Sequence, residues 1–281
     1  MDFGMNAPGS LDAGCELALV CMSSLGLVYI EPAKAVLLAS HEVHVSTRSP
    51  VAACMASQYA GWEIKGEKFF AMGSGPMRAA AGREELFDAI GYREQPEACV
   101  GVLETNKLPP EIVCVDIATK CNITPDRLTL LVAPTSSQAG TIQIVARSIE
   151  TALHKLHVLG FDLKRVQRAS GHAPLPPRAK NDITAIGWTN DAILYGGSVL
   201  LEVSGDDASI EKIGPSIPSN ASPDFGRPFA EIFERYAHDF YRIDPHLFSP
   251  AVVLLSNCET GTMFKYGNLR YEVLAESFAE K

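Results

Sequence analysis

The polar residues Thr189, Asn190 and Asp191 stand side by side between two apolar runs of the chain. Such groups are costly to bury unless they find a hydrogen-bonding partner. A chain that packs such groups between apolar runs usually gives them something to bind, so this segment is the candidate active centre. The same pattern is equally typical of a turn held by side-chain bonds to the backbone, so both interpretations stay open.

Two further segments join the end of an expected strand to the start of an expected helix, where free backbone N–H groups favour an anion. One is Gly73-Ser74-Gly75-Pro76-Met77-Arg78, and the other is Thr135-Ser136-Ser137. Each also fits an ordinary turn or N-cap. A single helix needs only one of the three hydroxyls as its cap. The glycine segment lacks the spacing of nucleotide-binding loops, so a nucleotide site is not expected.

The histidines and cysteines do not form a metal-binding pattern. His154 and His157 share a helix face, but no H-E-x-x-H motif accompanies them, and solvated histidines are the preferred interpretation. The 7 cysteines contain no C-x-x-C pair and lie mostly in apolar runs. Reduced thiols in a cytoplasmic protein and no bound metal are therefore expected. The charged residues between Gly226 and Pro245 are interpreted as surface ion pairs.

Composition limits the class of protein. The chain has 281 residues, 47% of them hydrophobic and 20% charged, which is typical of a soluble protein with one large or two medium domains. A net charge of -9 argues against a nucleic-acid or anionic-membrane partner. The N-terminus has no signal-peptide pattern, and the apolar runs are too short to span a membrane.

Hydrophobic periodicity predicts helices and strands that interleave along the whole chain, which indicates an α/β fold. Strands are expected at 27–30, 41–47, 62–64, 68–72, 99–104, 112–118, 128–132, 166–169, 192–195, 198–204, 251–257 and 262–266. Helices are expected at 11–24, from Ser49-Pro50 to Gly61, from Arg78 to Ile90, from the 133–140 segment to Gly160, at 228–236 and at 271–279. Loops are expected at 170–177 and 213–224. The sequence predicts two domains, residues 1–125 and 126–281, and is compatible with segments of one domain crossing into the other.

Several longer motifs, in one order along nearly the whole chain, resemble the bacterial branch of the methenyltetrahydromethanopterin cyclohydrolase family. The segments that carry the resemblance are 6–10, 56–62, 70–76, 133–137, 150–156, 189–197, 227–233 and 239–241.

The resemblance implies a two-domain α/β fold with a cleft between the domains, and a cytoplasmic homotrimer. It implies an enzyme of one-carbon metabolism that reversibly hydrolyses methenyl-tetrahydromethanopterin to formyl-tetrahydromethanopterin, without a metal or redox cofactor. The methenyl carbon is an electrophilic, positively charged amidinium carbon. A positioned carboxylate can aim water at it, deprotonate that water and stabilise the cation.

The resemblance also implies a catalytic carboxylate three residues after an arginine. In this chain it assigns the acid to Asp191, its positioning neighbours to Asn190 and Thr189, and the arginine position to Trp188. Substrate contacts are assigned to Thr189 and to residues of the two helix starts, which suit an anionic coenzyme tail: Gly73, Ser74, Gly75, Arg78, Thr135, Ser136 and Ser137.

An indole at position 188 cannot place a positive charge beside the carboxylate, so two hypotheses follow. In the first, the enzyme is active and another cation, Arg178, Lys180 or Arg78, takes the place of the arginine. In the second, the chain is a pterin-binding paralogue that has lost the reaction, with Trp188 stacking on the pterin ring. A third hypothesis, an unrelated hydrolase of a phosphorylated substrate, rests only on the two helix starts.

Overall fold

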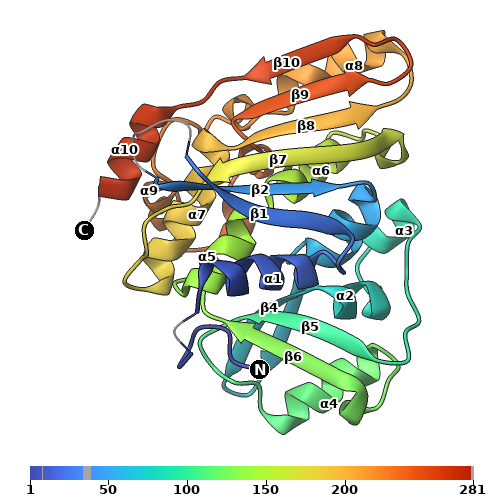
Figure 1. Ribbon diagram of the computed structural model, residues 1–281, viewed down its shortest axis with the longest axis vertical. Helices are drawn as coiled ribbons and strands as arrows, with labels where there is room; N and C mark the ends of the chain where they lie inside the picture. The colour runs from blue at the N-terminus through green and yellow to red at the C-terminus, as the bar shows by residue number, and fades with distance from the viewer. Residues whose placement is uncertain (8, 34–38, 280–281) are drawn as a thin grey trace.

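The computed structural model describes residues 1–7, 9–33 and 39–279, and these form two β-sheets with helices packed around and between them (Figure 1). The larger sheet has the strand order β1-β2-β7-β8-β9-β10, and the smaller sheet has the order β3-β4-β5-β6. The strands are β1 (Gly26–Pro32), β2 (His41–Thr47), β3 (Trp62–Gly66), β4 (Phe69–Ser74), β5 (Cys99–Glu104), β6 (Leu128–Ala133), β7 (Val166–Pro174), β8 (Ser198–Val203), β9 (Val252–Asn257) and β10 (Met263–Gly267). The expected α/β class is therefore confirmed as a mixed α/β fold.

Both sheets mix strand directions. The pairs β8–β9 and β5–β6 are parallel, and the other neighbouring pairs are antiparallel. A parallel pair needs a crossover connection, and β5 reaches β6 through helix α4 (Glu111–Lys120). The carboxyl ends of β5 and β6 consequently lie together, which is where ligands usually bind in α/β folds.

The helices are α1 (Leu11–Cys21), α2 (Pro76–Ala81), α3 (Leu86–Ile90), α4, α5 (Gln138–Val145), α6 (Ser148–Val158), α7 (Asp182–Gly196), α8 (Asp207–Ile213), α9 (Phe229–Arg235) and α10 (Tyr271–Ala279), with a π-helix, η1 (Val51–Gln58). Short 3₁₀ turns occupy η2 (Pro125–Arg127), η3 (Leu163–Arg165), η4 (Gly214–Ser216), η5 (Ser219–Ala221), η6 (Phe240–Arg242) and η7 (Pro245–Leu247). None of the helices in the described ranges is both long enough and apolar enough to cross a membrane.

Helices cover one face of the larger sheet. Helix α6 packs on β2, β7 and β8, and α7 packs on β7. Val43 and Val45 of β2 point into this layer and are buried, as their alternation with polar residues predicts. On β1, Val28 is buried, whereas Leu27 and Tyr29 on the opposite face are 66% and 46% exposed. An apolar part of the outer face of the sheet is therefore open to solvent.

Several predicted elements are confirmed, together with the local chemistry that starts them. Ser10 caps α1, because its hydroxyl accepts a hydrogen bond from the N–H of Ala13 at 3.0 Å. Ser137 caps α5 by accepting from the N–H of Gly140, also at 3.0 Å. The strands expected at 251–257 and 262–266 form the antiparallel pair β9–β10, and the helix expected at 271–279 is α10.

Two predicted strands are wrong. Residues 112–118 belong to α4, in which Val113 and Ile117 are buried four residues apart while Ile112 is exposed. That burial follows the helical period, which a short apolar run does not reveal by itself. Residues 192–195 lie inside α7, which is buried over most of its length and so lacks an amphipathic signature.

The long helix that was expected to end at Gly160 is two helices, α5 and α6, with Ala146 and Arg147 at the break. The helix expected to reach Ile90 is also divided, because Gly82 adopts a left-handed conformation with φ of +52°. The helix after Pro50 is the π-helix η1, and Ser49 contributes a carbonyl to the N–H of Ala53 rather than a side-chain cap.

Strand β7 continues to Pro174 and so replaces the first half of the loop predicted at 170–177. The larger sheet takes its strands from residues 26–47 and 166–267, while the smaller sheet takes its strands from 62–133. The strands therefore interleave. The domain boundary near residue 125 stays a prediction, and it falls between β5 and β6 of one sheet.

Candidate active site

Asp191 lies in α7 and is fully buried. One carboxylate oxygen, Oδ1, accepts a hydrogen bond from the N–H of Phe229 at 2.8 Å, and Oδ2 accepts from the Ser277 hydroxyl at 2.6 Å. These bonds tie α7 to the start of α9 and to α10. The catalytic role assigned to Asp191 stays a prediction, while the contacts give this carboxylate a structural role.

The neighbours of Asp191 also use their polar groups inside α7. The Thr189 hydroxyl donates to the carbonyl of Ala185 at 2.7 Å, and the Asn190 amide donates to the carbonyl of Ile186 at 2.8 Å. Such bonds to the preceding turn are common for these residues within helices. The segment is therefore a helix with satisfied donors rather than the turn that was considered as its alternative.

Trp188 is only 7% exposed and packs edge to face against Phe278 of α10, with ring centroids 6.2 Å apart. Its indole is part of the main core cluster, so stacking on a pterin would require it to leave that core. Arg178 and Lys180, two of the cations considered as replacements for an arginine at this position, are exposed. The alternative of a binding-only paralogue stays a hypothesis.

The helix start at residues 135–137 already holds a carboxylate of the protein. The backbone N–H and the hydroxyl of Ser136 both donate to Oδ1 of Asp182, at 2.9 and 2.7 Å. Ser137 is the cap of α5, and the carbonyl of Thr135 accepts from the Thr141 hydroxyl at 3.0 Å. Asp182 therefore supplies an anion at this helix start, and the substrate contacts assigned to Thr135, Ser136 and Ser137 stay predictions.

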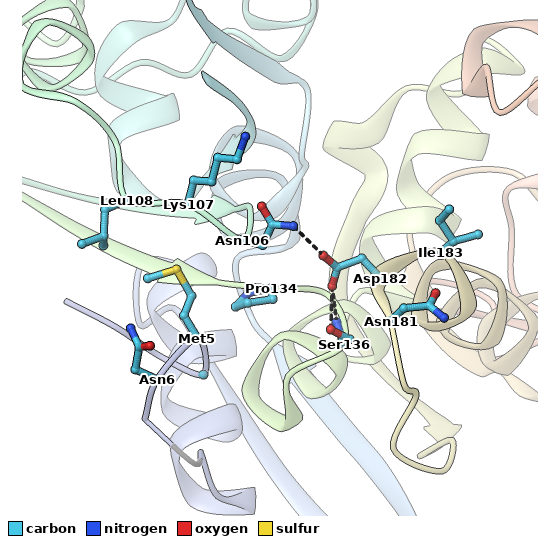
Figure 2. Close-up of a pocket in the computed structure, with 11 residues that line it drawn as sticks. Met5, Asn6, Asn106, Lys107, Leu108, Pro134, Ser136, Asn181, Asp182 and Ile183 are labelled. Atoms are coloured by element: carbon cyan, nitrogen blue, oxygen red, sulfur yellow. Dashed lines mark hydrogen bonds between the residues drawn. The ribbon is translucent and has the colours of Figure 1, made fainter. Parts of the chain in front are cut away.

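A surface pocket of about 910 Å³ adjoins Asp182 (Figure 2). In Figure 2, Asn106 and Ser136 approach the Asp182 carboxylate from the side of the smaller sheet, and the Asn106 amide lies 3.4 Å from Oδ2. The pocket lies where β5 and β6 end and where α7 begins. Amide, charged and apolar side chains share its lining, which consists of Gly4, Met5, Asn6, Asn106, Lys107, Leu108, Pro134, Ser136, Asn181, Asp182 and Ile183.

The predicted glycine segment forms a tight turn into the six-residue helix α2. Gly75 adopts φ of +87° and donates its N–H to the carbonyl of Ser57 at 2.8 Å, while Gly73 pairs with Trp62 at the end of β4. Ser74 is buried, and its hydroxyl lies 3.4 Å from Nη2 of Arg147. Of this segment, Ser74 and Arg78 thus face the buried charges described next.

Arg78 is a buried, fixed positive charge. Its Nε and Nη2 atoms form a bidentate pair with Glu84, at 2.8 and 2.5 Å, and Nη1 donates to the carbonyls of Met55 and Ala56. Its guanidinium carbon lies 4.7 Å from the ring centroid of Tyr59. Because every nitrogen has a protein partner, Arg78 acts on its surroundings through its charge.

Arg147 stands at the break between α5 and α6, a place that the sequence reasoning missed. Its Nη2 atom donates to Oε1 of Glu104 at 2.6 Å and to Oε1 of Gln143 at 2.8 Å. The pair with Glu104 is largely buried, the side chains being 6% and 15% exposed. Because the helix breaks at Arg147, its side chain reaches the ends of β4 and β5.

Glu150 lies three residues after Arg147, on the first turn of α6, and is 5% exposed. Burial raises the pKa of its carboxyl to about 7, the charges of Arg147 and Arg78 oppose this, and Glu104 adds to it. None of these influences is a hydrogen bond. The carboxyl therefore gains and loses its proton near neutral pH, as a general acid or base must.

Buried polar atoms without partners gather around the same helix break. In the described part of the chain these atoms are Oε1 of Gln58, Nε2 of Gln143, Nε of Arg147 and Oγ of Ser148. The Gln58 amide nitrogen donates to the carbonyl of Ala146 at 3.2 Å, so that residue also belongs to the junction. Unpartnered polar atoms are rare in protein interiors and indicate a bound water or ligand. We call Glu104, Gln143, Arg147 and Glu150 the buried charge cluster.

The sequence did contain a signal for this cluster. Arg147-Ser148-Ile149-Glu150 has an acid three residues after an arginine, which is the spacing that the family resemblance implied for its catalytic pair. Both residues are buried, Arg147 at the helix break and Glu150 on α6, and charged residues are rarely buried without a reason. Hydrophobic periodicity takes account of apolar residues only, so it does not reveal buried charged residues.

One of the two histidines of α6, His154, differs from its expected solvated state. The ring of His154 stacks on Tyr59 with centroids 5.0 Å apart, and burial lowers its pKa to about 4. It is therefore neutral at physiological pH. Among the described residues, no group of three or more His, Cys, Asp or Glu side chains is arranged to hold a metal ion.

Comparison with known proteins decides the family. A family model described as "Cyclohydrolase (MCH)" matches residues 1–278. The chain belongs to the MCH cyclohydrolase family. The MCH relatives include the methenyltetrahydromethanopterin cyclohydrolases of Methylobacillus flagellatus, 45% identical over 99% of this chain and 85% of that protein, and of Rhodopirellula baltica, 46% identical over the same shares. The Methanosarcina mazei MCH protein of the same name is 39% identical over 99% of this chain and 88% of its own length.

Proposed function

We propose that this chain is a methenyltetrahydromethanopterin cyclohydrolase, which reversibly hydrolyses the methenyl bridge of its pterin substrate to a formyl group in one-carbon metabolism. The names of its relatives support the substrate. The observation that carries the chemistry is Glu150, a buried carboxyl whose pKa burial raises to about 7 against the opposing charges of Arg147 and Arg78. No metal or redox cofactor is needed, because the positively charged methenyl carbon is already electrophilic.

Glu150 performs the proton transfers of this reaction. Its ionised form aims a water molecule at the methenyl carbon and takes a proton as the new C–O bond forms. The resulting carboxylic acid returns that proton to the ring nitrogen as the C–N bond breaks. The hydroxyl of the water adduct releases its remaining proton to solvent as the C=O bond forms, which leaves the neutral formyl compound. A pKa near 7 serves both steps, because the carboxyl accepts and releases a proton with similar ease. Glu150 thereby takes the role first assigned to Asp191.

The positive charges of Arg147 and Arg78 keep part of the buried Glu150 carboxyl ionised at neutral pH. Without their positive charges, burial would raise the Glu150 pKa further, and too little of the ionised form would be present at neutral pH. The unpartnered Nε of Arg147 is a donor suited to a polar atom of the substrate or of the attacking water. The cation required beside the catalytic acid is thus Arg147, and Trp188 does not have to supply it.

The cleft implied by the family resemblance is proposed to include the pocket of Figure 2. Asn106 lines that pocket and lies two residues beyond Glu104, so pocket and cluster share the end of β5. Residues from both sheet regions line it, because Asn106 follows β5 and Asp182 begins α7. We propose that this pocket binds the part of the pterin coenzyme that lies away from the methenyl carbon.

The protein is also proposed to be a cytoplasmic homotrimer, with the exposed Leu27 and Tyr29 of β1 among its contact residues. Sedimentation equilibrium is expected to give three times the chain mass for the unaltered protein and a smaller mass for Leu27→Glu. Phe70→Glu, a comparable change at an exposed residue of the smaller sheet, serves as the control. A single-chain mass for the unaltered protein would contradict the trimer.

The proposed activity is tested by adding pure protein to methenyl-tetrahydromethanopterin and following the loss of the methenyl absorption. We expect loss well above the rate in buffer and in heat-denatured protein, with formyl-tetrahydromethanopterin as the product. Substrate binding without any acceleration would favour the binding paralogue instead. Binding is measured separately by equilibrium dialysis, so the two results remain distinct.

A further inference from the structure

We propose that Glu104 is a positioning residue for the reaction: it holds the Arg147 guanidinium at the end of β5 and thereby limits how much of that positive charge acts on Glu150. This inference rests on the proposed function, in which Glu150 is the proton-transferring group. Nothing in the sequence motifs assigned a role to Glu104. Its position in the fold and its contact with Arg147 suggest one.

Glu104 is held in place by the smaller sheet. It is the last residue of β5, and it pairs with Met72 of β4 on one side and with Ala133 of β6 on the other. A residue paired on both sides of an inner strand has little backbone freedom, so its carboxylate provides a fixed anchor. Arg147 comes from the α5–α6 break and meets this anchor at 2.6 Å.

The remaining contacts of Arg147 are neutral. Gln143 accepts from the same Nη2 atom at 2.8 Å and is itself contacted by the thiol of Cys21 at 3.5 Å. Ser74 lies at 3.4 Å. Two carboxylates thus share one guanidinium: Glu104 by a direct charged hydrogen bond, and Glu150 through charge alone.

The groups that face Glu150 come from several elements. Arg147 stands at the helix break, Arg78 on α2 and Glu104 on β5, while Tyr59 and Cys54 come from the end of η1 and from η1 itself. The last two are neutral near pH 7, because burial raises both their pKa values. Arg78 stays paired with Glu84 in either case. Removing the charge of Glu104 therefore leaves Arg147 without its paired carboxylate, so more of its positive charge acts on Glu150, which then ionises at a lower pH.

The test is Glu104→Gln, in which an amide oxygen can still accept the hydrogen bond from Arg147 but carries no charge. We expect the acidic limb of the kcat profile to move about one pH unit or more toward acid. Glu94→Gln is the matched control: it neutralises a carboxylate that accepts from Tyr92 outside the buried charge cluster, and it should leave the midpoint of that limb in place. Glu104→Asp restores the charge and should restore the wild-type midpoint.

A second readout does not depend on turnover. The infrared carbonyl band of protonated Glu150, identified by its loss in Glu150→Gln, is titrated in wild type and in Glu104→Gln. A lower midpoint in Glu104→Gln supports the proposal, even if the protein proves not to hydrolyse the methenyl substrate. Equal midpoints, or a shift toward alkali, in a folded variant overturn it, while the proposed function would stand if wild type is active.

Discussion

Replacement of Glu150 by glutamine is expected to slow methenyl hydrolysis by about 10²–10⁴-fold, the usual contribution of a positioned general base. The amide keeps the size of the side chain but can neither take a proton from water nor return one to the ring nitrogen. Substrate binding should change little, because the pocket of Figure 2 and both arginines remain. The rate is measured by loss of the methenyl absorption under single-turnover conditions, and binding by equilibrium dialysis.

Glu94→Gln is the control for this variant. Glu94 accepts a hydrogen bond from Tyr92 away from the buried charge cluster, so its replacement should leave the hydrolysis rate within about threefold of wild type. A Glu150→Gln protein that binds substrate and still hydrolyses it at the wild-type rate would show that another group transfers the proton. Glu104 would then have no role in the reaction through Glu150 either.

Replacement of Asp191 by alanine is expected to lower the free energy of unfolding by about 3 kcal/mol, because buried partners lose their acceptor. The N–H of Phe229 and the hydroxyl of Ser277 both donate to this carboxylate inside the core. Turnover per folded molecule should remain close to wild type. Urea unfolding gives the first quantity, and the methenyl assay at protein concentrations corrected for the folded fraction gives the second.

Asp191→Asn separates the structural role from a catalytic one. An amide can still accept from Phe229 and can donate to Ser277, so most of the stability should return. A catalytic carboxylate would not tolerate this change. A large loss of turnover in a stable Asp191→Asn protein would therefore support the original assignment of Asp191 and contradict the structural role described above.

Much of the fold followed from local patterns. The hydroxyl residues at 135–137 predict a helix start, although not which of them is the cap, and the alternation from His41 to Thr47 predicts a strand. Both effects act within a few residues. The family followed from long motifs in a fixed order. The run 112–118 failed because a short apolar segment carries no period that separates strand from helix.

The site was harder to predict, because its geometry depends on contacts distant in sequence. The helix breaks at Arg147 where the side chain meets Glu104, which lies 43 residues earlier in the chain. No local rule marks that break. The polar residues around Asp191, by contrast, stand out in the sequence because they interrupt an apolar run. Their hydrogen-bond partners lie in α7 itself, at the start of α9 and in α10.

The interleaving of the two sheets has a consequence for biosynthesis. Strand β2 ends at Thr47, and its partner β7 starts at Val166, so the larger sheet cannot close until most of the chain has left the ribosome. At about 5–20 residues per second this wait is on the order of ten seconds. The smaller sheet draws only on residues 62–133 and can form first. The β1–β2 hairpin, with its exposed Leu27, meanwhile presents an unpaired edge to the cell.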